Sequence, residues 1–92
     1  MRALPLDLPG SELVSVGLQD LAGGVESVEA LLVSIGEPRL RDLGLDVPEP
    51  LPDPEHRLYE RLATDDPDRA HSRYNSLVRR LVSFERAAAC VV

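Results

Sequence analysis

The densest group of side chains able to do chemistry lies in the segment 69–80, which combines four arginines with a histidine, a tyrosine and an asparagine. On a helix, residues four apart share a face, so this segment would form two polar stripes that begin at Arg69 and His71. Guanidinium groups donate strong hydrogen bonds to carboxylates and phosphates. The candidate ligand-binding residues are Arg69, His71, Arg73, Tyr74, Asn75, Arg79 and Arg80.

The alternative is that these arginines bind carboxylates of their own chain. The acidic residues on the neighbouring predicted turns are Glu55, Glu60, Asp65 and Asp68. Charged helix faces are usually solvated or paired in this way, and such pairs contribute little to stability. We therefore favour internal pairing and keep a ligand site as the competing hypothesis.

The two histidines and the single cysteine give little support for a metal centre or a catalytic site. His56 and Glu60 are four residues apart and could face one ion, but His71 belongs to a different predicted helix. Neither a paired-ligand spacing for zinc nor a Gly-x-Ser-x-Gly motif nor a phosphate-binding glycine loop occurs. We predict no metal, no cofactor and no catalytic residue; the alternative is an enzyme that uses His71 or Tyr74 as its acid or base.

The charge of the chain is acidic overall but unevenly distributed. The net charge is −6, and all ten basic residues are arginine. Residues 1–66 hold five arginines against fourteen carboxylates, whereas residues 67–92 hold five arginines against two. An acidic chain lacks the basic footprint that nucleic acid binding needs, so we do not expect nucleic acid as a partner. The basic segment either packs against the acidic part, which we favour, or stays free for an anionic partner.

The length and composition indicate one small domain over residues 1–92. Its apolar runs are too short to cross a bilayer, and we expect no membrane association. Cys90 is the only cysteine, and the beginning of the chain does not resemble a signal peptide. These features lead us to expect a soluble, cytoplasmic protein.

Capping residues and apolar spacing predict an all-α fold, a small bundle of four to five helices. The predicted helices span residues 12–22, 28–35, 38–44, 54–64 and 67–90. Ser11 and Asp53 are the predicted N-caps of the first and fourth, and Gly36 ends the second. Residues 11–22 also alternate between apolar and polar, so a strand remains the alternative there.

The long C-terminal helix, which Asp66-Pro67 would open, carries apolar residues alternately four and three positions apart. This apolar seam consists of Ala70, Tyr74, Leu77, Leu81, Phe84, Ala88 and Val91. Such spacing is typical of a contact between two helices. Because a small domain has few helices with which to cover it, we predict a homodimer. The predicted interface residues are Tyr74, Leu77, Leu81, Phe84, Ala88 and Val91.

In the alternative arrangement, the protein is a monomer in which its own segments cover the apolar seam. One such segment is the extended N-terminal arm, residues 1–10, whose Leu4, Leu6 and Leu8 would lie on one side. The helix 27–36 is the other. A proline-rich connector, residues 45–54, would be extended and stiff, and serves as a spacer or as a docking motif for a proline-binding domain.

Taken together, these features favour a small non-enzymatic protein-interaction or regulatory module that acts as a helical homodimer with a protein partner. One alternative is a helical domain that binds a small anionic ligand through the Arg/His/Tyr patch of segment 69–80. Another is an acidic, antitoxin-like inhibitor of a larger protein.

Overall fold

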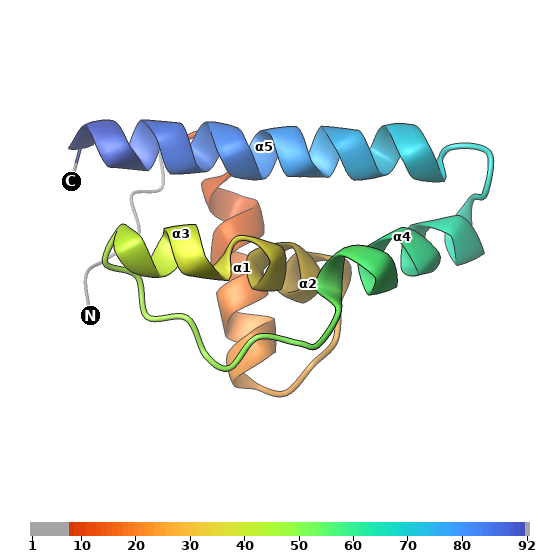
Figure 1. Cartoon of the computed structure of the whole chain (residues 1–92), viewed down its shortest axis with the longest axis horizontal. Coiled ribbons are helices and arrows are strands. Elements are labelled where there is room, and N and C mark those ends of the chain that lie inside the picture. The colour runs from red at the N-terminus through yellow and green to blue at the C-terminus, as the bar shows by residue number, and fades with distance from the viewer. Residues whose placement is uncertain (1–7, 92) are drawn as a thin grey trace.

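The computed structural model describes residues 8–91, which form five helices and no strand (Figure 1). The helices are α1 (Ser11–Ala22), α2 (Val28–Ile35), α3 (Glu37–Asp42), α4 (Pro54–Asp65) and α5 (Ala70–Val91). The predicted all-α fold with a long C-terminal helix is confirmed, and residues 11–22 are a helix rather than a strand. α5 runs along one side of the molecule, antiparallel to α4. No helix within residues 8–91 is long and apolar enough to span a membrane.

α2 is the centre of the hydrophobic core. It contacts α1, α3, α4 and α5, and its residues Ala30, Leu31, Leu32 and Val33 are fully buried. A helix that is apolar on most of its circumference must be surrounded by other elements. Burying each leucine or valine contributes about 1.5–3 kcal/mol, so α2 anchors its neighbours by hydrophobic contact.

α1 crosses α2 at very short range, and Gly17 makes this possible. A Cβ atom at Gly17 would lie 2.4 Å from the carbonyl oxygen of Glu29 and 2.4 Å from Cγ2 of Val33. Both distances are far below van der Waals contact. The absence of a side chain at Gly17 therefore sets the separation between the two helices.

Two of the predicted helix starts are wrong. Ser11 does not cap α1; it lies inside the helix, and Gly10 takes the cap position with φ +77°. A residue with a side chain is strained there, and its Cβ would lie 2.7 Å from the carbonyl oxygen of Arg80. α5 begins at Ala70 instead of Pro67. Asp66 still ends α4 by donating its backbone N–H to Leu62, so the reversal between the two helices needs residues 67–69 as a turn.

Asp53 is the N-cap residue of α4, as predicted, and Pro54 begins the helix. Asp53 has a left-handed backbone, at φ +48°, and its side chain makes no capping hydrogen bond. Ser27 takes that role for α2, because its hydroxyl accepts a hydrogen bond from the Ala30 N–H at 3.0 Å.

The proline-rich connector packs against its own domain. The Leu51 N–H donates to the hydroxyl of the buried Ser34 at 3.0 Å, and Arg41 donates to the carbonyl of Val47 at 2.9 Å. Val47 is itself buried. Leu8, the last leucine of the N-terminal arm, also packs against the core, whereas Leu4 and Leu6 lie outside the described residues.

Candidate interaction surface on the C-terminal helix

The inner face of α5 is occupied by the chain's own core. Ala70, Leu81, Phe84 and Ala88 are buried, and α1, α2 and α4 all contact α5. Two further members of the apolar seam, Tyr74 and Leu77, are half-buried and pack against the same core. The side chain of Val91 lies outside the described residues. Helices of the same chain therefore cover most of the apolar seam, as the monomer alternative requires.

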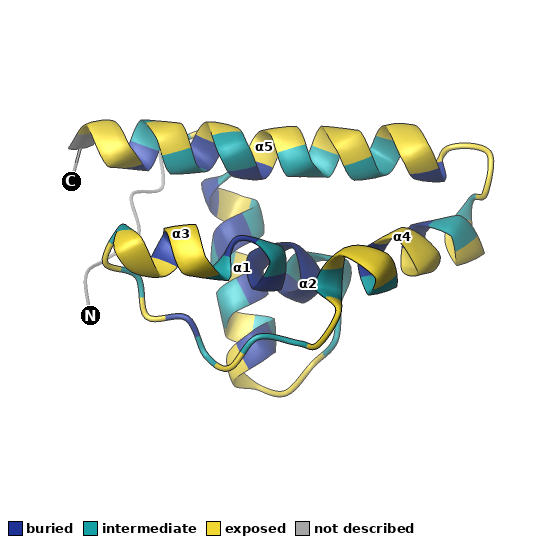
Figure 2. Cartoon of the chain, viewed as in Figure 1, coloured by how far each residue is buried: buried dark blue, intermediate teal, exposed yellow. Residues whose placement is uncertain are grey.

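The outer face of α5 carries arginines. Arg69 lies in the turn just before the helix, and we call the set Arg73, Arg79, Arg80 and Arg86 the arginine face. All of them except the half-buried Arg73 are exposed, and Figure 2 shows the exposed residues along the edge of α5 that points away from the other helices. The position of the arginines follows from the apolar seam, because residues out of phase with a buried 4-3 repeat must face solvent.

One arginine of the arginine face is paired within the chain. Arg73 binds the Asp65 carboxylate at 2.7 Å. Over residues 8–91, no hydrogen bond or ion pair joins the side chains of Arg69, Arg79, Arg80 or Arg86 to another group. The favoured expectation, that the acidic part of the chain neutralises the basic helix, thus applies to a single pair.

The other acidic candidates, Glu55, Glu60 and Asp68, form no ion pair with an arginine of α5 within residues 8–91. Glu60 binds His56 on its own helix at 2.8 Å. Glu55 lies near Tyr74, where its charge adds to burial, the larger effect, in raising the pKa of that phenol. A phenol with a raised pKa keeps its proton at neutral pH, which makes Tyr74 a poor general base.

The structure separates the seven candidate ligand-binding residues. Tyr74 points toward α4, and its ring lies 5.9 Å from that of Tyr59, centroid to centroid. His71 and Asn75 form a hydrogen bond of 3.2 Å with each other on the exposed surface. The seven side chains do not converge as a small-molecule site requires.

Two arginines of the candidate set, Arg73 and Arg80, line different surface hollows. Arg73 lines a hollow of about 380 Å³ together with Val28, Glu29, Ser76 and Leu77. Arg80 lines another, of about 170 Å³, together with Leu8, Gly10, Ser11 and Glu12. Each hollow also contains a carboxylate, which opposes the binding of a small anion.

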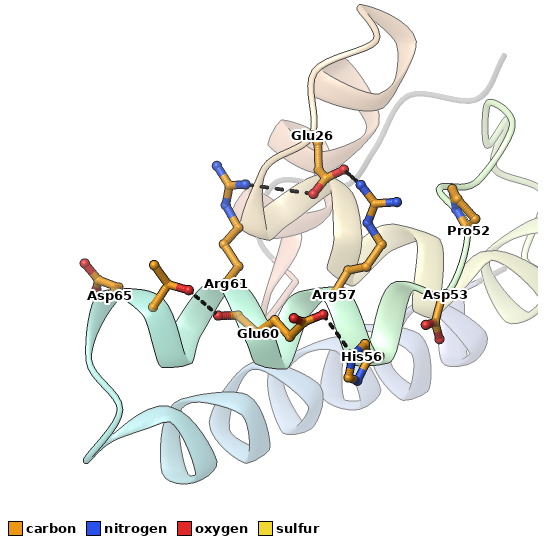
Figure 3. Close-up of a pocket in the computed structure, with 9 residues that line it drawn as sticks. Glu26, Pro52, Asp53, His56, Arg57, Glu60, Arg61 and Asp65 are labelled. Atoms are coloured by element: carbon orange, nitrogen blue, oxygen red, sulfur yellow. Dashed lines mark hydrogen bonds and ion pairs between the residues drawn. The ribbon is translucent and has the colours of Figure 1, made fainter.

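A second charged cluster, on α4, was not predicted from the sequence. Arg57 and Arg61 reach across from α4 to the two carboxylate oxygens of Glu26, which precedes α2 (Figure 3). They line an open hollow of about 910 Å³. The spacing of Arg57 and Arg61 shows that they share a face, but Glu26 is 31 positions from Arg57, and no local pattern indicates that contact.

This cluster has no free capacity for an anion. Its hollow is lined by four carboxylates against two arginines, and both arginines already bind Glu26. The carboxylates are Glu26, Asp53, Glu60 and Asp65. Within residues 8–91, no group of three histidine, cysteine or acidic residues is placed to hold a metal ion.

Comparisons of the chain with protein-family models, with curated proteins and with solved structures gave no match.

Proposed function

We propose that the protein is a non-enzymatic interaction module that binds an acidic surface of a partner protein through the arginine face of α5. The observation that carries the proposal is the absence of carboxylate partners, among the residues described, for Arg79, Arg80 and Arg86, the three exposed arginines of α5. Elsewhere among the described residues, Arg57, Arg61 and Arg41 bind acidic side chains, and Arg39 stands singly without an ion pair.

The core fixes the position of this face. Phe84 is fully buried and Leu81 is 3% exposed, and both lie on the side of α5 that packs against the rest of the chain. Around the helix, Arg79 and Arg86 lie opposite this side, and Arg73 and Arg80 border it. Because α5 is 22 residues long and held along its length, the arginines stand on a rigid helix. A binding surface that is already ordered avoids part of the conformational entropy that association otherwise costs.

Charge favours an acidic protein over nucleic acid. Exposed arginines attract an acidic partner over a distance and raise the association rate at low salt. The chain as a whole carries −6, so the rest of its surface repels a polyanion as extended as DNA or RNA. A compact acidic patch can meet the arginine face without approaching the acidic surfaces.

The arginine face is unsuited to the contact of a homodimer. A two-fold contact through the outer face would place the arginines of one copy against those of the other, and like charges across an interface cost several kcal/mol. The arginine face therefore suits an unlike partner better than a second copy. A homodimer, if it forms, would use another surface.

Charge reversal on two helices tests the proposal. Arg79→Glu/Arg80→Glu alters the arginine face, and Arg39→Glu/Arg61→Glu changes the net charge equally at two exposed positions elsewhere. The wild type and both variants are used to capture proteins from the native cell extract, and each captured protein is then purified and titrated against all three forms.

We expect a partner that binds the wild type and Arg39→Glu/Arg61→Glu, fails to bind Arg79→Glu/Arg80→Glu, and binds more weakly as salt is raised. Melting curves verify that all three forms are folded. The same set of bound proteins for all three forms would contradict the proposed function.

A further inference from the structure

The arginine face consists of two parallel rows. Arg79 and Arg86 are seven residues apart, and so are Arg73 and Arg80. At about 100° per residue, the two members of each row lie within roughly 20° of each other around the helix. Over seven residues α5 rises about 10.5 Å, so the two arginines of each row lie at that separation along the helix axis. Among the described residues, the first row presents two unpaired guanidinium groups, and the second presents Arg80 together with Arg73, which is paired with Asp65.

The helix surface between the two rows carries short side chains. Ser76 and Ser83 lie between them around the helix and are exposed. Neither serine extends as far as an arginine. A partner segment can therefore lie along α5 between the rows, with charged side chains directed to both sides, as residues flank the contact in a coiled coil.

From this arrangement, and resting on the proposed function, we infer that the partner presents an α-helix with acidic residues seven positions apart on the two edges of its contact face. Residues seven apart on a helix return to nearly the same face and repeat at the spacing of the arginines. An extended segment covers the same length in about three residues. Residues three apart on a strand point to opposite sides, and those two or four apart repeat at about 6.8 or 13.6 Å, so an extended partner matches the spacing of a row less closely than a helix does.

The chain itself shows the chemistry of one such contact. Arg73, in the second row, binds Asp65 at 2.7 Å, and the Asp65 side chain is 73% exposed. A carboxylate in water therefore already occupies one end of the arginine face. A partner carboxylate at Arg80, one heptad further along, would extend the same type of contact.

Three synthetic peptides of about three heptads test this inference, each labelled for fluorescence anisotropy. The matched peptide is an alanine- and glutamine-rich helix with glutamates seven apart on two edges. The permuted peptide has the same composition with its glutamates distributed around the helix. The third peptide is the matched sequence with a central proline, which breaks the helix. Circular dichroism verifies the helicity of each.

We expect the matched peptide to bind at least about tenfold more tightly than the other two, which corresponds to about 1.4 kcal/mol. Arg79→Glu/Arg80→Glu should abolish its binding, and Arg39→Glu/Arg61→Glu should leave it nearly unchanged. Equal binding of all three peptides would overturn the helical partner but retain the proposed function, because the surface would then respond to charge alone.

Two further outcomes concern the proposed function itself. If no peptide binds at low salt, both the inference and the proposed function fail. The second outcome concerns the oligomeric state, which analytical ultracentrifugation of the protein alone measures. A salt-sensitive dimer that Arg79→Glu/Arg80→Glu dissociates would assign the arginine face to a second copy and overturn the unlike partner.

Discussion

Replacing Gly17 with alanine tests the contact between α1 and α2 with a single methyl group. In an exposed helix, glycine to alanine stabilises by about 0.5–1 kcal/mol, because alanine loses less backbone entropy on folding. At Gly17 the added Cβ would lie 2.4 Å from the carbonyl oxygen of Glu29, a backbone atom of the buried helix α2. Neither helix can move by the required distance without disturbing the core around Val33.

The steric cost therefore exceeds the gain in propensity. Overpacking a well-packed core costs about 1–3 kcal/mol, and more where backbone is in the way. We expect Gly17→Ala to lower the free energy of unfolding by about 2 kcal/mol after the propensity gain. For a chain of this size, that corresponds to a fall of about 8–16 °C in melting temperature.

Gly23→Ala is the matched control. Gly23 follows α1 at φ −85°, which alanine adopts without strain. The nearest atom to its added Cβ would be 3.6 Å away, an ordinary contact. We expect its melting temperature to stay within a few degrees of the wild type. Thermal melts followed at 222 nm and urea titrations measure both variants. A Gly17→Ala protein as stable as the wild type, or more stable, would refute the close crossing of α1 and α2.

Other variants test the faces of α5 and the ion pairs. Leu81→Ala should cost about 2–5 kcal/mol, because Leu81 is buried, and Arg80→Ala less than about 0.5 kcal/mol; equal losses in urea would contradict the assignment of faces. Burial raises the pKa of the Glu85 carboxyl, and the charge of Arg39 partly opposes this effect. Because the folded state holds this proton more tightly than the unfolded state, the free energy of unfolding falls as the pH rises from the ordinary carboxyl pKa through the raised one. Glu85→Gln should therefore melt higher than the wild type at pH 7 and equally at pH 4; the same difference at both pH values would exclude ionisation as its cause. Glu26→Gln should cost less than about 1 kcal/mol at low salt and less still in 1 M NaCl, since its partners are partly exposed; a loss of several kcal/mol would mean that the pair is effectively buried.

The spacing of apolar residues predicted most of the fold. The 4-3 repeat of the apolar seam located α5 and its buried side, and Gly36 and Asp53-Pro54 lie at the helix ends where their types predicted them. The errors lie where tertiary contact overrides local preference. Ser11 is a good capping residue, but the close approach of the chain to the Arg80 carbonyl requires glycine before it.

The candidate site was predicted in part. The sequence located the arginines in two stripes, and the structure places most of them on the exposed face. It did not show which carboxylates they would meet, because ion pairs between helices depend on how the helices cross. Glu26 is the example: it binds Arg57 and Arg61 across a long sequence separation, although acidic residues of α4 itself are much nearer in sequence.

The remaining surface limits the kind of partner further. The large apolar side chains exposed within residues 8–91 are Val16, Val25 and Tyr59, and they belong to α1, the loop after it and α4. Apolar side chains that stand singly do not form the contiguous patch that marks an obligate hydrophobic interface. With most of the apolar seam inside the core, the described surface offers charge and shape rather than hydrophobic area. Interfaces of that kind form quickly, depend on salt and are readily reversed, which fits a regulatory contact better than a permanent subunit.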